Sequence, residues 1–153
     1  MASPGTASAL ENDSQVVEGN KALVGRLLDE GLIDGNQTIV SELYDPGFVG
    51  RDGWARQMPG PVGLPMSRTD YKIAFPDLTV TLDAIVAEGD FVATHESRWS
   101  SHPPTGTHLE GQTMHLVRIA NGQIMERWRA GWEWFPPRGG QPELRRCNPL
   151  LGH

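Results

Sequence analysis

The stretch LEGQTMHLVRIANGQIMERWRAGWEWF, residues 109–135, decides the fold of this chain. Apolar and polar residues alternate on both sides of Asn121-Gly122, and a period of two is typical of strands. Asn-Gly is the dipeptide that two-residue hairpin turns prefer, because both of its positions tolerate a positive φ. The stretch therefore predicts two antiparallel strands, roughly 109–120 and 123–135.

Two further strands are predicted upstream of this hairpin. Residues 78–87 alternate in polarity, and Glu-Gly-Asp at 88–90 is typical of a hairpin turn that leads into a strand at 91–101. A Pro-Pro-Thr-Gly turn at 103–106 then connects to the stretch already described. The second half of the chain is thus predicted to form four antiparallel strands.

The first half of the chain predicts helices instead. Leucine and valine recur at helical spacing over 14–32, a second apolar helix face spans 36–44, and a third helix is expected at 66–74. Between the last two, residues 50–65 hold four glycines and three prolines, and loops of this length often act as lids or binding segments. Helices followed by strands predict an α+β fold, in which a curved sheet wraps the helices and leaves a pocket between them.

Composition limits the kinds of function. The chain has 153 residues, a formal net charge of −6 and one cysteine, Cys147. A single cysteine excludes a disulfide within the chain, the acidic balance disfavours nucleic acid as a partner, and no run approaches the ~18 apolar residues of a membrane span. The polar N-terminus does not resemble a secretory signal, so a cytoplasmic location is expected. We expect a disordered leader at 1–13, one domain at 14–135 and a Pro/Gly-rich tail at 136–153.

Several short motifs, in this order, resemble the SnoaL-like polyketide cyclases. They are NKALV at 20–24, LYDPGFV at 43–49, AFPDL at 74–78, GDFVA at 89–93, PTG at 104–106 and RIANGQIMERW at 118–128. The resemblance runs from about residue 18 to 135 and places the chain in the nuclear transport factor 2-like superfamily. It implies a cone-shaped α+β barrel with three N-terminal helices packed on a curved antiparallel sheet, and a homodimer formed through the outer face of that sheet.

The same resemblance implies an activity. The family's cyclases close a ring within a polyketide or aromatic substrate without a cofactor, using a carboxylate on the last strand as general acid and base. That carboxylate lies four residues after the tryptophan matched by Trp128, a position occupied here by Trp132. Glu133 is adjacent, but a shift of one residue turns a strand side chain to the other face unless a β-bulge intervenes. Two kinds of ring closure stay open, an aldol type and an epoxide-opening ether formation.

Four residues are the candidate catalytic groups. His102 matches a histidine of the family, and His115 lies in the middle of a predicted strand. Histidine titrates near neutral pH and suits acid–base catalysis without a cofactor. Glu133 is the carboxylate nearest to the missing one, and Tyr44 could reach over the mouth of the pocket. The alternatives are hydrogen-bonded structural histidines and a tyrosine of the core.

The candidate substrate-binding residues are aromatic or ionisable side chains of the sheet and of the long loop: Trp128, Trp132, Trp54, Arg51, His95 and Glu126. Tryptophans suit flat, conjugated ligands. If the last strand is regular, Glu126, Trp128 and Trp132 share the pocket face, and Arg127 and Arg129 point outward. The alternatives are tryptophans that fill the core or a dimer interface, and a structural ion pair between Glu126 and a nearby arginine.

No spacing typical of a metal site and no nucleotide-binding glycine loop occurs, so neither a metal nor a cofactor is expected. The primary hypothesis is a cofactor-independent cyclase of natural-product biosynthesis that binds a hydrophobic small molecule. A hydroxylase partner, hydrolase or isomerase using the same pocket, or a non-catalytic ligand-binding module, are the alternatives. We expect a homodimer, and no nucleic acid or membrane partner.

Overall fold

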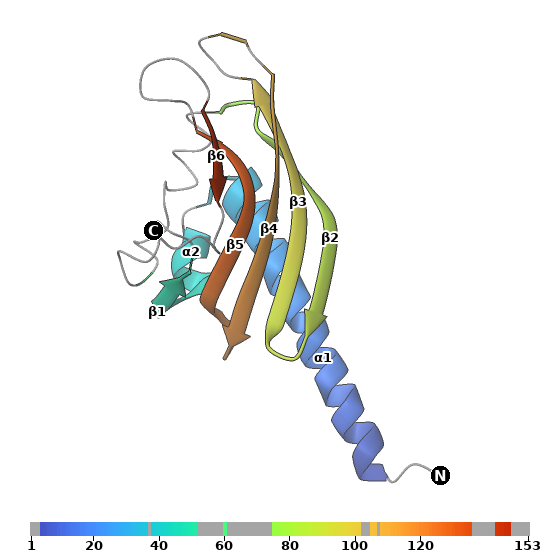
Figure 1. Cartoon of the computed structure of the whole chain (residues 1–153). Coiled ribbons are helices and arrows are strands. Elements are labelled where there is room, and N and C mark those ends of the chain that lie inside the picture. Colours follow the sequence, from blue (N-terminus) through green and yellow to red (C-terminus); the bar gives the residue numbers. More distant parts are fainter. Residues whose placement is uncertain are drawn as a thin grey trace.

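The structure is a computed structural model of the chain. It describes residues 4–36, 38–51, 60, 75–101, 105–106, 108–135 and 143–147, with the backbone alone at 4–11, 32, 132–135 and 143–147. A long helical segment crosses one face of a curved sheet, which confirms the predicted α+β class (Figure 1).

The helical part has three labelled segments: α1 (Pro4–Arg26), its π-helical continuation η1 (Leu27–Ile33) and α2 (Thr38–Leu43). α1 begins inside the segment for which a leader is predicted. Arg26 joins these segments, because its guanidinium contacts Glu30 at 2.6 Å and Glu42 at 2.5 Å. These segments correspond to two of the three predicted helices, at 14–32 and 36–44. The third, at 66–74, lies outside the described residues.

The sheet has six strands: β1 (Tyr44–Gly50), β2 (Thr79–Glu88), β3 (Phe91–Ser101), β4 (His108–Ala120), β5 (Gln123–Phe135) and β6 (Glu143–Cys147). Strands β2 to β5 form the predicted antiparallel series, in the spatial order β1-β5-β4-β3-β2. Asn121 and Gly122 have φ values of 51° and 71°, as the predicted hairpin turn requires.

The prediction of a wholly antiparallel sheet is wrong at one edge. β1 pairs with β5 in the parallel direction, and β6 pairs with a later part of the same strand, at residues 131–135. Residues 51–122 separate β1 from β5, so no hairpin forces these two strands to run in opposite directions. Alternation in the sequence does not reveal pairing direction, which is why the predicted series omits the parallel pair.

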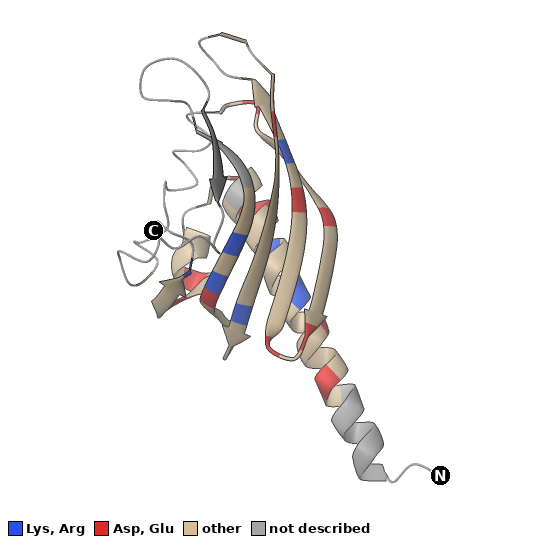
Figure 2. Ribbon diagram, viewed as in Figure 1, with Lys and Arg blue, Asp and Glu red and all other residues tan. Residues whose placement is uncertain are grey.

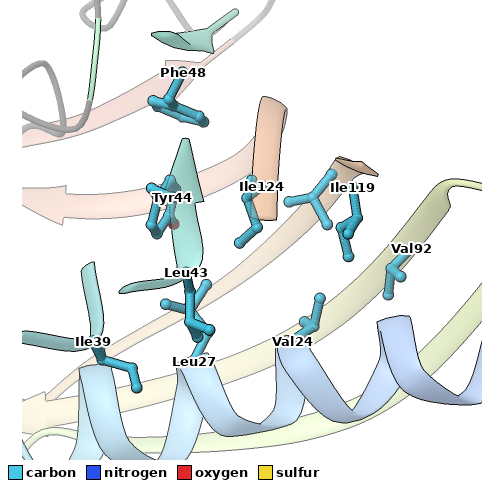
Figure 3. Close-up of a cluster of buried hydrophobic side chains, with 10 residues drawn as sticks. Val24, Leu27, Ile39, Leu43, Tyr44, Phe48, Val92, Ile119 and Ile124 are labelled. Atoms are coloured by element: carbon cyan, nitrogen blue, oxygen red, sulfur yellow. The ribbon is translucent and has the colours of Figure 1, made fainter. Parts of the chain in front are cut away.

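The hydrophobic core lies between α1 and one end of the sheet. It is built from ten buried residues: Val24, Leu27, Ile39, Leu43, Tyr44, Phe48, Val92, Val117, Ile119 and Ile124. Figure 3 shows Val24 and Leu27 of the helix opposite Val92, Ile119 and Ile124 of the sheet. Burial of each such side chain contributes about 1.5–3 kcal/mol, so this cluster fixes the helix against the sheet. We call the sheet face that carries these residues the inner face, and the opposite one the outer face.

Two further contacts fasten the ends of the sheet. The Asn20 amide of α1 donates to the carbonyl of Gly89 in the β2–β3 turn, at 3.1 Å. At the other end of this hairpin, Asp77 accepts hydrogen bonds from the Ser100 hydroxyl at 2.6 Å and from the Ser101 backbone N–H at 3.0 Å. These hydrogen bonds lower the pKa of Asp77 to about 2, and the bond from the Ser100 hydroxyl has the largest effect.

Candidate active site

Beyond the apolar core, the inner face of the sheet becomes polar. Its side chains there come from the three central strands: Thr94, Glu96, Arg98, Thr113, His115, Arg127 and Arg129. We call this group the inner polar cluster. Five of its members are more than nine-tenths buried, including Glu96 at 2% exposure and both arginines of β5 at 8%. Ionisable side chains are rarely so buried unless they are paired or functional, so the cluster is the candidate active site.

The strand register brings these side chains together. Thr94 pairs with His115, and His115 pairs with Arg129, in one row across β3, β4 and β5. The next row is Glu96, Thr113 and Gly131. Directly opposite residues have Cβ atoms about 4.5–5.5 Å apart, so groups distant in sequence meet across the strands.

Glu96 is the centre of the cluster. One carboxylate oxygen, Oε2, accepts a hydrogen bond from Arg98 Nη2 at 2.7 Å. The other, Oε1, accepts one from the Thr94 hydroxyl at 3.1 Å and lies 3.8 Å from His115 Nε2. The hydrogen bond from the guanidinium is charge-assisted, and such bonds are shorter and stronger than those between neutral groups.

The imidazole of His115 has a guanidinium and a carboxylate as neighbours. Its Nε2 is 3.5 Å from Arg98 Nη2 and 3.8 Å from Glu96 Oε1. An unprotonated Nε2 can accept from the guanidinium, and a protonated one can interact with the carboxylate. The surroundings therefore accommodate the imidazole with and without its second proton, as a general acid–base residue requires.

The remaining members of the inner polar cluster lie near Glu96 and His115. Arg127 sits at the border with the core, where its guanidinium lies 5.9 Å from the centre of the Phe48 ring. Thr113 is 1% exposed, and its hydroxyl has no hydrogen-bond partner among the described residues. A buried hydroxyl without a partner carries a free-energy cost of about 1–3 kcal/mol, so it is poised to bond to a ligand.

Gly131 lets β5 approach β4 at this row. Its φ is +146°, and a Cβ added there would lie 2.8 Å from Thr113 Cα, closer than side-chain atoms pack. The residue thus combines a backbone conformation that disfavours side chains with a close strand contact. It brings the β5 backbone directly against Thr113.

The predicted orientation of the last strand is wrong. Arg127 and Arg129 were expected to point outward, but they lie on the inner face, and Glu126 and Trp128 lie on the outer one. The reason is a β-bulge: Arg118 pairs with Glu126, whereas the next residue of β4 pairs with Ile124, so Met125 is an extra residue. One extra residue reverses the faces of all that follow.

Glu126 forms an ion pair on the outer face. Its carboxylate accepts from Arg118 Nη2 at 2.7 Å and from Arg51 Nη2 at 2.8 Å. These bonds, the one from Arg118 first, lower the pKa of Glu126. The prediction that Glu126 lies on the pocket face is therefore replaced by the structural alternative, an ion pair. Arg51, predicted as a substrate-binding residue of the long loop, belongs to the same network, which joins the end of β1 to β4 and β5.

Three other predicted residues also lie away from the inner polar cluster. Tyr44 is 1% exposed and packs edge-on against Phe48 with ring centres 4.8 Å apart, so it belongs to the core and not to a pocket mouth. His95 lies on the outer face, where its Nδ1 is 3.4 Å from Asp83 Oδ2. Trp128 lies on that face too, with its ring centre 6.3 Å from that of Phe91.

The structure does not describe the side chains of the remaining predicted residues. His102 and Trp54 lie outside the described residues. Trp132 and Glu133 belong to β5, where their backbones pair with Arg146 and Arg145 of β6. Their predicted roles stay predictions.

Sequence reasoning found one member of the cluster, His115, and missed the others. Thr94, Glu96 and Arg98 do alternate along β3, which is the signal a half-polar strand face leaves. The intervening residues His95 and Ser97 are polar as well, so the pattern did not reveal which side was buried. The buried side follows from Val92, a core residue on the same face of β3 as Thr94, Glu96 and Arg98.

Within the described residues, no group of three or more His, Cys, Asp or Glu side chains is arranged to hold a metal ion. In the same part of the chain, no helix has the length and apolar character needed to cross a membrane.

Solved structures resemble this fold over most of their length. IdmH from Streptomyces antibioticus, a proposed polyketide cyclase, is 26% identical; the match covers 73% of this chain and 91% of that one, with a TM-score of 0.63. A proposed SnoaL-like polyketide cyclase from Jannaschia sp. CCS1 is 23% identical; the match covers 75% of this chain and 86% of that one, with a TM-score of 0.63. AclR from Streptomyces galilaeus, a proposed hydroxylase, is 20% identical, covers 75% and 90%, and has a TM-score of 0.65. The last two, at their low identity, show the fold alone.

No curated protein matches the sequence. The family model of the SnoaL-like polyketide cyclases matches residues 22–131, more than half of the chain. This span includes all of α2, β1, β2, β3 and β4, and every member of the inner polar cluster. The chain belongs to the SnoaL-like polyketide cyclase family.

Proposed function

We propose that this protein closes a ring within a polyketide or aromatic natural-product intermediate by general acid–base catalysis on the inner face of its sheet, without a cofactor. The observation that carries the proposal is the placement of His115 Nε2 between Glu96 Oε1, at 3.8 Å, and Arg98 Nη2, at 3.5 Å. Family membership supplies the class of reaction. The cluster supplies the groups that such a reaction needs.

The proposed aldol step moves one proton and forms one carbon–carbon bond. His115 takes a proton from a carbon next to a substrate carbonyl, and the resulting enolate attacks a second carbonyl in the same molecule. The alkoxide so formed takes a proton back from the imidazolium, so the product has the same atoms as the substrate. Glu96 stabilises the imidazolium that exists between the two proton transfers.

Positioning supplies much of the rate in this account. An intramolecular reaction whose ends are held together gains an effective concentration of up to about 10⁵–10⁸ M relative to separate reactants. The rigid β3–β5 scaffold carries the acid–base pair on strands, which hold side chains more firmly than loops do. In the epoxide-opening alternative, His115 takes the proton of a substrate hydroxyl, whose oxygen forms the new ether bond as the epoxide C–O bond breaks. The imidazolium then returns this proton to the former epoxide oxygen.

His102 and Glu133 remain proposed contributors. The position of Glu133 on β5 follows that of Gly131 by two residues, next to the row that holds Glu96 and Thr113. A substitution at each separates their contribution from that of His115. Full activity in both Glu133→Gln and His102→Ala would assign the proton transfers to the inner polar cluster alone.

Product analysis in ¹⁸O-labelled water tests the reaction class. The probes are aromatic precursors with an open β-keto side chain. They are incubated with the full chain and analysed by mass spectrometry. Ring closure gives a product of unchanged mass, or one lighter by a water if dehydration follows, with no label beyond the carbonyl exchange seen in an enzyme-free control. A hydrolase incorporates solvent oxygen. A hydroxylase, as proposed for the structurally similar AclR, adds an oxygen atom. Either addition would contradict the cyclase proposal.

We also propose that two copies associate through the outer face of the sheet. That face exposes apolar side chains from three strands: Val86, Phe91, Trp99, Met114 and Leu116. Exposed fractions reach 64% at Val86 and 56% at Met114. Clustered apolar side chains on a sheet face are typical of an interaction surface.

A further inference from the structure

We propose that Thr94 is a positioning residue of the candidate active site: its hydroxyl occupies Glu96 Oε1 and so keeps this carboxylate from binding the proton that His115 has to exchange with the substrate. The inference rests on the proposed function, because it concerns the same acid–base pair. It adds a residue that acts through Glu96 and not on the substrate itself.

The place of Thr94 in the sheet leaves its hydroxyl little freedom. The residue is 3% exposed on β3, between its register partners Ile85 of β2 and His115 of β4. A β-branched side chain is stiff about χ1, and Thr94 and Glu96 lie two positions apart on the same face of one strand. The hydroxyl therefore donates to Glu96 Oε1, at 3.1 Å, from a fixed direction.

The two oxygens of Glu96 are held by different donors. Oε2 accepts from Arg98 Nη2 at 2.7 Å, and Oε1 accepts from the Thr94 hydroxyl. Figure 2 shows acidic and basic positions following each other along β3, with basic positions of β5 across the sheet. At 2% exposure Glu96 has little access to water, so protein donors have to satisfy its oxygens.

His115 offers the next donor to Oε1. Its Nε2 is 3.8 Å from this oxygen, beyond hydrogen-bond distance. A buried acceptor that loses its donor carries a free-energy cost, so without the Thr94 hydroxyl Oε1 would turn to a protonated Nε2. The hydroxyl also directs the positive end of its dipole at Oε1, and its removal makes the potential at the imidazole more negative. Both effects favour the imidazolium.

A more stable imidazolium would slow both proton transfers of the proposed reaction. Fewer molecules would hold the unprotonated imidazole that starts it, and the imidazolium would return its proton less readily. At 3.8 Å, Glu96 stabilises the imidazolium by its charge without a hydrogen bond. The Thr94 hydroxyl therefore sets how strongly Glu96 holds the proton of His115.

NMR titration of the His115 ring in the full chain tests this inference without a substrate. Thr94→Val replaces the hydroxyl by a methyl group of similar size, and it should raise the midpoint of the ring titration by about 0.5–1 pH unit. Thr94→Ser keeps the hydroxyl and should restore the original midpoint. Glu96→Gln removes the negative charge and should lower the midpoint, the opposite direction.

Thr113→Val is the matched control in this titration. Thr113 is a second buried threonine of the inner face, and its hydroxyl bonds to no described residue. The same exchange there should leave the midpoint unchanged. The charged side chains near His115 on the sheet are the same in all threonine variants: Glu96 and Arg98 of β3, and Arg127 and Arg129 of β5.

Three results would overturn the inference: an unchanged or lowered midpoint in Thr94→Val, no restoration in Thr94→Ser, or an equal rise in Thr113→Val. Thr94→Ala removes the hydroxyl without adding bulk and gives the same reading if the valine variant does not fold. The titration needs no turnover, so its outcome is separate from that of the ring-closure assay. In that assay, the low-pH limb of the kcat/KM profile of Thr94→Val should move up by the same amount.

Discussion

At the scale of single residues, the inner polar cluster is better explained by chemistry than by stability. A buried ion pair such as Glu96–Arg98 is often no more stabilising than well-packed apolar residues of similar volume. The neighbouring positions Val92 and Val117 show that this face can be apolar. The charged side chains are therefore concentrated around His115, on the part of the inner face that lies outside the apolar core. This distribution favours a catalytic role for the inner polar cluster.

Gly131 gives a prediction at this scale. Gly131→Ala should lower the free energy of unfolding by roughly 2 kcal/mol or more, because its φ of +146° and the nearby Thr113 backbone leave no room for a Cβ. Chemical denaturation measures the difference. Gly25→Ala is the control, since Gly25 lies in α1 and a Cβ there meets nothing within 4 Å. Equal stability of the two variants would show that the strand contact is not as close as described.

At the scale of elements, one extra residue in β5 decides which side chains reach the site. The lengths of the β2–β5 strands and the Asn121-Gly122 turn could be predicted, because alternation and turn chemistry are local properties. The bulge at Met125 could not, since it depends on how β4 and β5 pair. This single register shift exchanged the expected faces of Trp128 and Arg129.

The outer-face network at Glu126 gives the prediction at this scale. Its carboxylate joins Arg51, just beyond β1, to Arg118 of β4, and its side chain is 17% exposed. Glu126→Gln should destabilise the protein by about 1–2 kcal/mol at neutral pH. The lowered pKa means that this stability is present above the ordinary value of 4.5 and is lost as the pH falls through the depressed value.

Thermal unfolding of both proteins from neutral pH to well below pH 4.5 checks this expectation. The difference between them should be largest at neutral pH and shrink in acid. Glu88→Gln, at an exposed position of β2, serves as the control and should change little. A difference that is constant across the whole pH range would rule out the ion-pair explanation.

At the scale of the whole molecule, the α+β class and the family could be predicted, and the arrangement of the candidate active site could not. Motif order along the chain carried the family resemblance, which depends on the sequence alone. The inner polar cluster draws its members from three strands, and its contacts exist only after β3, β4 and β5 are aligned. The parallel pairing of β1 is likewise a property of the assembled sheet.

The outer face gives the prediction at this scale. Light scattering should show a dimer at micromolar concentration, and Met114→Glu should give a folded monomer, because Met114 is 56% exposed and is one of the apolar side chains of the outer face. Val16→Glu, on α1 and 43% exposed, is the control and should remain dimeric. A monomeric unchanged protein would refute the proposed association.

The most direct test of the central claim is the turnover of His115→Gln in the ring-closure assay, measured beside His108→Gln. His108 is on the same strand but on its exposed side, where it lies 2.8 Å from Glu110. If His115 is the acid–base residue, its loss should reduce kcat by about 10²–10⁴-fold while the control retains full activity. Unchanged turnover in His115→Gln would contradict the account and assign the proton transfers to other residues.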